Sequence, residues 1–274
     1  MNRRAFVKYL SGACAGLLTS SCVSSKGLSA GKDAPLFSFL FCNDLHINNE
    51  EHAAYFIESV ENWNRFADRF DFVVVGGDLV EYGRTEEFSL AKSALDRLKN
   101  PYYTVVGNHD VSGEGDAGKA AYRAAFGTGR EDYVIQHRGV ALLFLDLTEA
   151  QRSNVTVGQH TIDWLAKALP GIPQQMPIIT CSHFPMHPEN PKFPVKNSAP
   201  LFEMLDKRTV LAYFSGHYHG IWQGERDGVP FFGNTCLSLL KNNYDGSTEE
   251  GYLFVKVYED RVAVKHIARL QKPD

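Results

Sequence analysis

The chain has 274 residues, 44% of them hydrophobic and 22% charged, and a formal net charge of −4. This length fits one large domain, and no internal repeat or linker interrupts it. The acidic balance disfavours nucleic-acid backbones as the main partner. Of the five cysteines, Cys42, Cys181 and Cys236 lie outside the N-terminal segment and far apart, which does not describe a disulfide framework. We expect Cys42 and Cys181 to be small buried residues.

The first 21 residues are typical of an export signal. Arg3 and Arg4, followed by Ala-Phe-Val-Lys, resemble a twin-arginine signal, and an apolar run extends from Leu10 to Leu18. A membrane-spanning helix needs about twenty apolar residues, so we expect this segment to be removed rather than to span. Its removal takes Arg3, Arg4 and Lys8 away with no acid, which changes the formal charge from −4 to −7.

Cys22 follows small residues and resembles the lipid-accepting cysteine of a bacterial lipoprotein, although Thr19 stands where such signals usually carry Leu. Cys14 is a poorer alternative, and ordinary cleavage to give a soluble periplasmic enzyme is the other interpretation. We expect residues 1–21 to be the export signal, residues 22–34 a small and polar tether, and residues 35–274 the folded domain. The protein is then exported, either periplasmic or attached to a membrane by its lipid.

Helical spacing of apolar residues predicts four helices. The clearest covers residues 51–70, where Phe56, Val60 and Trp63 fall on one face. A second begins at Thr85 as its cap and ends before Asn100-Pro101. Two more are expected at residues 119–126 and 159–169. The alternation of strands and helices up to Pro101 predicts a largely parallel sheet.

Five apolar runs of strand length each lead directly into polar residues. The runs cover residues 37–42, 72–75, 102–106, 178–181 and 210–214. Catalytic residues of open α/β sheets lie beyond the carboxyl ends of such strands, so we expect these polar residues to gather at one sheet edge. They are Asp44, His46, Asp78, Asn108, His183, His217 and His219. Oxygen and nitrogen donors without a thiolate suit two divalent ions of the Mn, Fe or Zn kind.

The order of these short motifs closely resembles the calcineurin-like metallophosphoesterase family. The chain carries Asp-x-His at 44–46, Gly-Asp at 77–78, Gly-Asn-His-Asp at 107–110, a lone His183 and Gly-His-x-His at 216–219. The resemblance runs from about residue 36 to residue 220 and implies an α/β fold, a four-layer α/β/β/α sandwich of two mixed sheets. It also implies that Asp78 bridges two metals, one held with Asp44, His46 and His219, the other with Asn108, His183 and His217.

The remaining segments supply further strands and loops. Residues 133–136 and 140–145 predict a hairpin, and Asp146 at its end is a weaker candidate for an eighth ligand. Residues 229–232, 235–239, 252–258 and 262–267 suggest a second, mainly antiparallel sheet. Residues 112–118 predict a mobile loop at the rim. The long loop that begins at His183 is expected to line a binding site, with His187 either contacting substrate or facing solvent.

Hydrolysis of phosphate esters is the activity that this resemblance implies. His109 is not a ligand, and we expect Asp110 to fix its tautomer so that it protonates the leaving oxygen or holds the phosphate. The run from Gly77 to Gly83 resembles bacterial class III cyclic nucleotide phosphodiesterases, which favours a small phosphodiester as substrate. A phosphomonoesterase or nucleotidase is the alternative. A non-catalytic binding scaffold is more remote, because such a protein is expected to lose ligands and none is missing.

Overall fold

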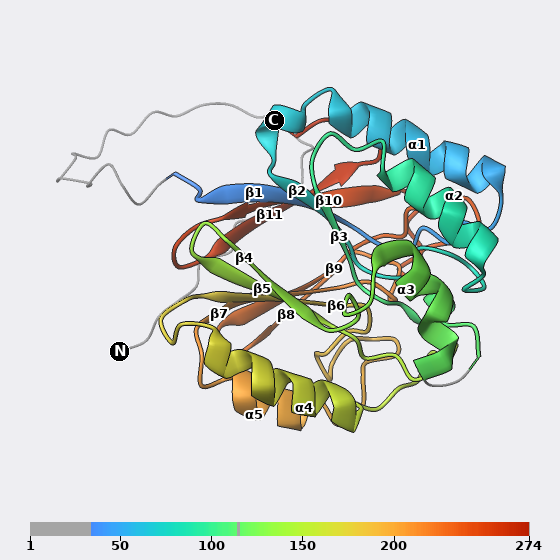
Figure 1. Ribbon diagram of the computed structural model, residues 1–274. Coiled ribbons are helices and arrows are strands. Elements are labelled where there is room, and N and C mark those ends of the chain that lie inside the picture. Colours follow the sequence, from blue (N-terminus) through green and yellow to red (C-terminus); the bar gives the residue numbers. More distant parts are fainter. Residues whose placement is uncertain (1–33, 114–115, 274) are drawn as a thin grey trace, which may run out of the picture.

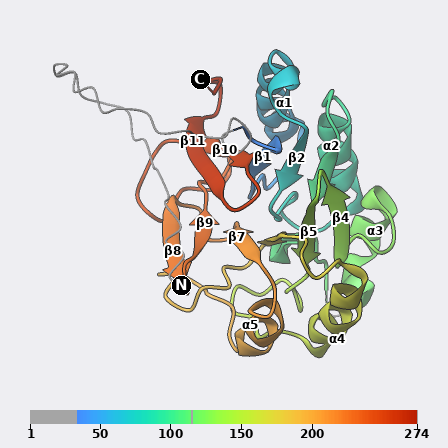
Figure 2. The ribbon, with the colours of Figure 1, turned by 90° about the vertical axis from the view of Figure 1, so that its left-hand side faces the viewer.

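Two β-sheets lie face to face between two groups of helices in the computed structural model, which describes residues 34–113 and 116–273 (Figure 1). Figure 2, turned by 90°, shows α1 and α2 outside one sheet and α4 and α5 outside the other. These four layers confirm the expected α/β/β/α sandwich. The export signal and nearly all of the tether lie outside the described residues, as do residues 114–115 of the expected rim loop. No described helix is long and apolar enough to cross a bilayer.

The first sheet has the order β11-β10-β1-β2-β3. Its parallel part consists of β1 (Phe37–Cys42), β2 (Phe72–Val75) and β3 (Tyr102–Thr104). β10 (Gly251–Val257) pairs antiparallel with β1, and β11 (Val262–Ala268) pairs antiparallel with β10. Both neighbours of β1 therefore hold it along its length, so the residues that follow it start from a well-fixed strand end.

The second sheet has the order β4-β5-β6-β7-β9-β8. Its centre is parallel and consists of β5 (Val140–Leu145), β6 (Ile178–Ser182), β7 (Val210–Ser215) and β9 (Val229–Gly233). The edges are β4 (Tyr133–His137) and β8 (Trp222–Arg226), each antiparallel to its neighbour. The expected hairpin of β4 and β5 is confirmed, and β5 is buried along its whole length.

The assignment of strands to sheets differs from the expectation. The five strands with polar ends do not share one sheet edge, because β1, β2 and β3 are in the first sheet while β6 and β7 are in the second. The C-terminal hairpin of β10 and β11 extends the first sheet instead of starting an antiparallel one. Which strands pair depends on contacts between residues far apart in the chain, and the local apolar pattern does not contain that information.

One further strand prediction was wrong, and one strand was not predicted. Residues 235–239 form no strand, because Leu237 donates its N–H to the Asn43 and Asp44 carbonyls and so lies against the end of β1. The edge strand β8 was not predicted, because Gln, Gly, Glu and Arg make up most of it. Its side chains alternate between half-buried and exposed. Edge strands need no apolar face on their free side, so their sequence signal is weak.

The observed helices lie where the sequence predicts them, but their lengths agree less well with the prediction. α1 (Glu50–Asn64) starts at Asn49, whose side chain accepts the His52 N–H, and ends six residues earlier than expected. α2 (Thr85–Leu95) begins one residue earlier than expected, because Arg84 and not Thr85 occupies the cap position and the Glu87 carboxylate accepts the Arg84 N–H. α3 (Ala120–Phe126) and α4 (Gln159–Ala168) are close to the predicted bounds. α5 (Ala199–Leu205) lies in a region expected to lack regular structure.

Three apolar layers hold this arrangement together. One lies between the first sheet and α1, α2 and α3, a second lies between the two sheets, and a third lies between the second sheet and α4 and α5. Aromatic rings fill the central layer, where Phe39 stacks on Phe72 and meets Phe214 of the opposite sheet edge to face. Close packing of such rings leaves little freedom for one sheet to slide over the other, so their strand ends stay in register.

Candidate active site

The expected ligands lie at the carboxyl ends of strands from both sheets, and several have unusual backbone conformations. Nine non-glycine residues among those described have positive φ, and five of them belong to this set: Asp44, His46, Asp78, His217 and His219. Such conformations cost of order 1–3 kcal/mol each and persist where the surrounding structure requires them. Their concentration at one place indicates a functional centre, since ordinary turns would use glycine or asparagine there.

A close approach between two loops also requires a glycine. A Cβ atom added at Gly107 would lie 2.1 Å from Oδ1 of Asp78 and 2.2 Å from its backbone nitrogen. Any other residue would therefore push the loop after β3 away from the loop after β2. The glycine that precedes Asn108 thus brings this ligand beside Asp78.

The first group of ligands consists of Asp44, His46, Asp78 and His219, whose ligand atoms lie within 4.8 Å of one another. His219 Nε2 is 3.0 Å from Asp44 Oδ1 and 3.4 Å from His46 Nε2. The other oxygen of Asp44 accepts the His217 N–H and the Asn43 amide, so Oδ1 is the oxygen that faces the histidines.

The second group consists of Asp78, His183 and His217, with the Asn108 amide beside them. His183 Nε2 is 3.1 Å from both Asn108 Oδ1 and His217 Nδ1. Asp78 joins the two groups through a single atom, because its Oδ2 is 3.6 Å from His46 Nε2 and 3.3 Å from His183 Nε2. Its Oδ1 accepts the backbone N–H of His109 at 2.8 Å. The arrangement indicates a bridging carboxylate that shares one oxygen.

All four imidazoles use their outward nitrogen as a hydrogen-bond donor. His46 donates to the Glu81 carboxylate, His183 to the Gly76 carbonyl, His217 to the Ser153 carbonyl and His219 to the Asn242 carbonyl. These partners fix the tautomers, so the lone pair of each inward nitrogen points into the centre. Partners of this kind are typical of histidines that bind metals, and the residues present fit a pair of divalent ions.

The electrostatics of the buried carboxylates lead to the same conclusion. Burial alone lowers the pKa of a histidine, but the Asp44 carboxylate raises that of His219 to about 11, and Asp78 raises that of His183 to about 9. Burial lowers the pKa of His217 to about 3, which keeps it neutral. Two buried carboxylates thus attract positive charge strongly, and divalent cations can supply it in place of protons.

Glu81 is a positioning residue that the sequence analysis missed. Its carboxylate lies 2.7 Å from His46 Nδ1 and 2.7 Å from Lys241 Nζ, and its carbonyl accepts His109 Nδ1 at 2.8 Å. One residue therefore orients a ligand and the neighbouring non-ligand histidine. Its position three residues after Asp78, in the loop that follows β2, is the only signal in the sequence that could have identified it.

The expected contact between Asp110 and His109 is wrong. The Asp110 carboxylate is fully buried and accepts the backbone N–H groups of Gly107 and Val80, which ties two ligand-bearing loops together. Its burial also excludes direct contact with a substrate. His109 is oriented by Glu81 instead, and its side chain stays 24% exposed at the edge of the centre. It is thus the one residue of the pair that can meet a substrate.

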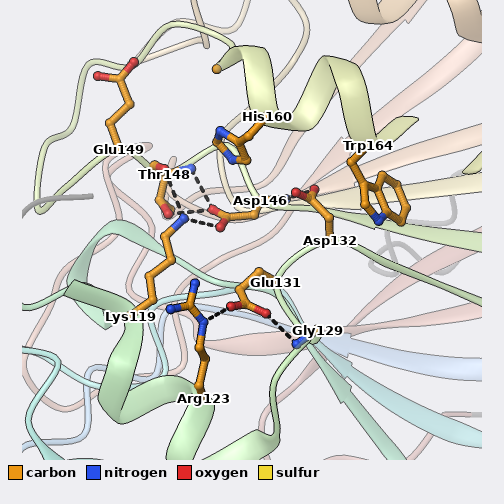
Figure 3. A pocket seen from close by; sticks show the side chains of 11 residues that line it. Lys119, Arg123, Gly129, Glu131, Asp132, Asp146, Thr148, Glu149, His160 and Trp164 are labelled. Atoms are coloured by element: carbon orange, nitrogen blue, oxygen red, sulfur yellow. Dashed lines mark hydrogen bonds and ion pairs between the residues drawn. The ribbon is translucent and has the colours of Figure 1, made fainter. Parts of the chain in front are cut away.

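Two other sequence candidates, Asp146 and His187, lie outside this centre. Asp146 binds Lys119 and Thr148 in the wall of a separate cavity of about 660 Å³, shown in Figure 3, and is no ligand of either group. His187 is buried against Trp222 and Phe231 and bonds the Glu225 carbonyl, so it contacts neither solvent nor the centre. Cys42 and Cys181 are free and buried, as expected of small core residues. Cys236 is also free and buried, and its thiol contacts the ligand His219.

The fold and the site define a class of proteins, the metallophosphoesterases. The chain belongs to the calcineurin-like phosphoesterase family, whose pattern matches residues 37–220 and so includes all seven expected ligands. Hydrolysis of phosphate esters at a metal centre is the activity of this class, and the geometry above provides for it.

Two curated relatives are phosphodiesterases by name. The chain is 26% identical over 200 residues to the glycerophosphodiester phosphodiesterase GpdQ of Enterobacter lignolyticus, covering 65% of this chain and 69% of the relative. It is 22% identical over 229 residues to a 3′,5′-cyclic-nucleotide phosphodiesterase of Nostoc, covering 78% and 82%.

Solved structures share the fold at lower identity. A purple acid phosphatase from yellow lupin superposes with a TM-score of 0.63 at 13% identity, over 89% of this chain and 54% of that one. GAP50, the anchor in the inner membrane complex of Plasmodium, superposes with a TM-score of 0.59 at 14% identity, over 86% of each chain. These likenesses show the fold alone.

The shared oxygen of Asp78 leads to a prediction on metal content. Asp78→Ala should lower occupancy in both groups, whereas His46→Ala or Asn108→Ala should mainly lower it in one, because only Asp78 belongs to both. Elemental analysis of each purified variant after dialysis against limiting Mn²⁺ measures this. Two full equivalents of metal in Asp78→Ala would show that the carboxylate is not the bridge.

Glu81 gives a second prediction. Glu81→Ala should weaken metal binding in the His46 group by about 10- to 100-fold, since outer hydrogen-bond partners of ligands typically contribute that much. Binding in the His183 group should change little. Calorimetric titration with Mn²⁺ resolves the two steps. Glu81→Gln is the matched control, because it keeps an acceptor for His46 and should lose less; equal losses in both variants would contradict a role through this hydrogen bond.

Proposed function

We propose that this protein is an exported phosphodiesterase whose dinuclear centre uses Mn, Fe or Zn. The observation that carries the proposal is the set of four inward imidazole nitrogens around the shared oxygen of Asp78. Bound divalent ions would offset the charge of the phosphoryl oxygens and lower the pKa of the attacking water. Asn108 is a neutral ligand candidate, so the protein contributes few negative charges that would repel an anionic substrate.

His109 is the residue placed to act on the leaving group. Its Nδ1 donates to the Glu81 carbonyl at 2.8 Å, which leaves Nε2 free for the substrate, and the Glu81 carboxylate lies 3.5 Å from the same Nδ1. That negative charge compensates the positive charge of a protonated imidazole. We infer that His109 protonates the leaving oxygen, while Asp44 and Asp78 hold the metals in place.

A preference for diesters is supported by the two curated relatives, which are named as phosphodiesterases. The test is a comparison of bis-p-nitrophenyl phosphate with p-nitrophenyl phosphate, using protein loaded with Mn²⁺ and protein treated with a chelator. We expect a higher kcat/KM for the diester, restored by Mn²⁺ and absent from Asp78→Ala. A higher value for the monoester would identify a phosphomonoesterase. Full metal occupancy with no turnover of either ester, or of 3′,5′-cyclic AMP and glycerophosphocholine, would indicate a binding scaffold.

The role of His109 can be separated from simple positioning of the phosphate. A general acid contributes about 10²- to 10⁴-fold only where the leaving oxygen needs a proton. His109→Ala should keep both metals and lose far more kcat/KM on an alkyl or ribose ester than on a p-nitrophenyl ester, whose anion leaves without one. Equal losses on the two esters at the same pH would remove the general-acid role.

Export and anchoring are the remaining part of the proposal. The Arg3-Arg4 pair, the short apolar run and Cys22 support it. If Cys22 carries a lipid, the protein should sediment with membranes and Cys22→Ala should move it to the soluble fraction. Replacing Arg3 and Arg4 together by Lys should block a twin-arginine route, whereas a general export signal should tolerate that change.

A further inference from the structure

The loop between β6 and α5 places two residues over the candidate centre. The ring of Phe193 packs on the ligand His217, with ring centroids 5.4 Å apart. Phe193 has a φ of 55°, a left-handed conformation that is rare for a bulky residue. Its neighbour Lys192 extends toward the group of ligands that contains His219. Its Nζ lies 3.3 Å from the centroid of the Tyr244 ring, which packs on His219. This dipeptide therefore spans from one group to the other.

Tyr244 connects Lys192 to the centre. Its ring stacks on that of the ligand His219, with centroids 5.1 Å apart and planes inclined by 19°, and its N–H donates to the His219 carbonyl at 2.7 Å. A lysine above an aromatic face is attracted by the ring electrons and held near it. The position of the ammonium group is thus fixed relative to His219 through one ring.

The charge of Lys192 is not neutralised by the described part of the chain. No carboxylate oxygen of the residues at 34–113 and 116–273 forms an ion pair with its Nζ, whereas the neighbouring Lys241 pairs with Glu81. Among the described residues its Nζ lies over two aromatic rings, that of Tyr244 and, at 5.3 Å from the centroid, that of Phe193. A half-buried lysine held by rings alone can still accept an anion. Such an anion has to come from outside the described chain, and the centre beside Lys192 is one that binds anionic substrates.

A row of ring contacts connects His109 with Tyr244, the residue whose ring lies under Lys192. His109 meets His46 at 4.7 Å between centroids, His46 meets His219 at 5.3 Å, and His219 meets Tyr244 at 5.1 Å. His109 and Lys192 are therefore at opposite ends of this row. If the leaving group lies beside His109, the ester group that stays on the phosphorus is the one that can extend toward Lys192.

We infer that Lys192 is a specificity residue that binds an anionic group, a carboxylate or a second phosphate, on the non-leaving ester of the substrate. The inference rests on the proposed phosphodiesterase activity and narrows its substrate class. Diesters with an acidic non-leaving group are favoured, and diesters with a cationic group such as choline are disfavoured. In this inference Lys192 does not bind the phosphoryl group, which lies at the metal ligands and His109.

The test uses three diesters with the same p-nitrophenolate leaving group and an ethyl, 2-carboxyethyl or choline group as the second ester. The measured quantity is the ratio of kcat/KM for the carboxyethyl ester to that for the choline ester. In Lys192→Met this ratio should fall by about fivefold, the upper range for one partly exposed ion pair, and the change should lie in KM. Lys192→Glu should lower the ratio further. Lys256→Met is the matched control, since that lysine also lies over a ring but belongs to β10, away from the centre.

The outcomes separate this inference from the function on which it rests. If the wild type hydrolyses the ethyl ester but Lys192→Met keeps the wild-type ratio, Lys192 does not select the substrate. If no ester is hydrolysed, the proposed function is wrong. In that case, the affinities of the carboxyethyl and choline methylphosphonates for the Mn²⁺-loaded protein, measured by calorimetry, test the inference on Lys192. A wild-type preference for the carboxyethyl compound that is lost in Lys192→Met supports the inference. Equal affinities of the wild type for the two compounds overturn it.

Discussion

A single oxygen atom has to face histidines from two different sheets. Oδ2 of Asp78 lies between His46, which follows β1 in the first sheet, and His183, which follows β6 in the second. The atom can serve both only if the two sheets keep a fixed separation and register. The aromatic layer between them, with Phe39 and Phe72 on one side and Phe214 on the other, provides that constraint. Core packing and metal binding are thus coupled in this protein.

The ligands could be predicted from the sequence because each one is a local feature. Every ligand follows an apolar run within a few residues, and an apolar strand that ends in a polar residue can be identified without knowledge of its neighbours. The helices could be placed for the same reason. The predicted helix ends were less accurate. At α2, for example, Arg84 and Glu87 form the cap, and arginine is not a residue that usually caps a helix.

Which strands belong to which sheet could not be predicted. β1 pairs with β2 on one side and with β10, about 210 residues later in the sequence, on the other. The orientation of His109 was missed for a related reason. Asp110 is adjacent in sequence, but it turns away to hold the backbone of Gly107, and Glu81 from another loop takes its place. Lys192 could not be identified either, because nothing in a Pro/Asn-rich loop indicates that it passes over Tyr244.

The family pattern ends at residue 220, yet β1, the strand that precedes Asp44, depends on residues beyond it. Phe37 lies opposite Val257 in the sheet, and the segment at Leu237 closes over the Asn43 and Asp44 carbonyls. During synthesis β1 therefore gains its second neighbour only after the residues of β10 have been made, about 210 residues later in the chain. The backbone that positions Asp44 is therefore completed by residues that follow the last expected ligand, His219, in the sequence.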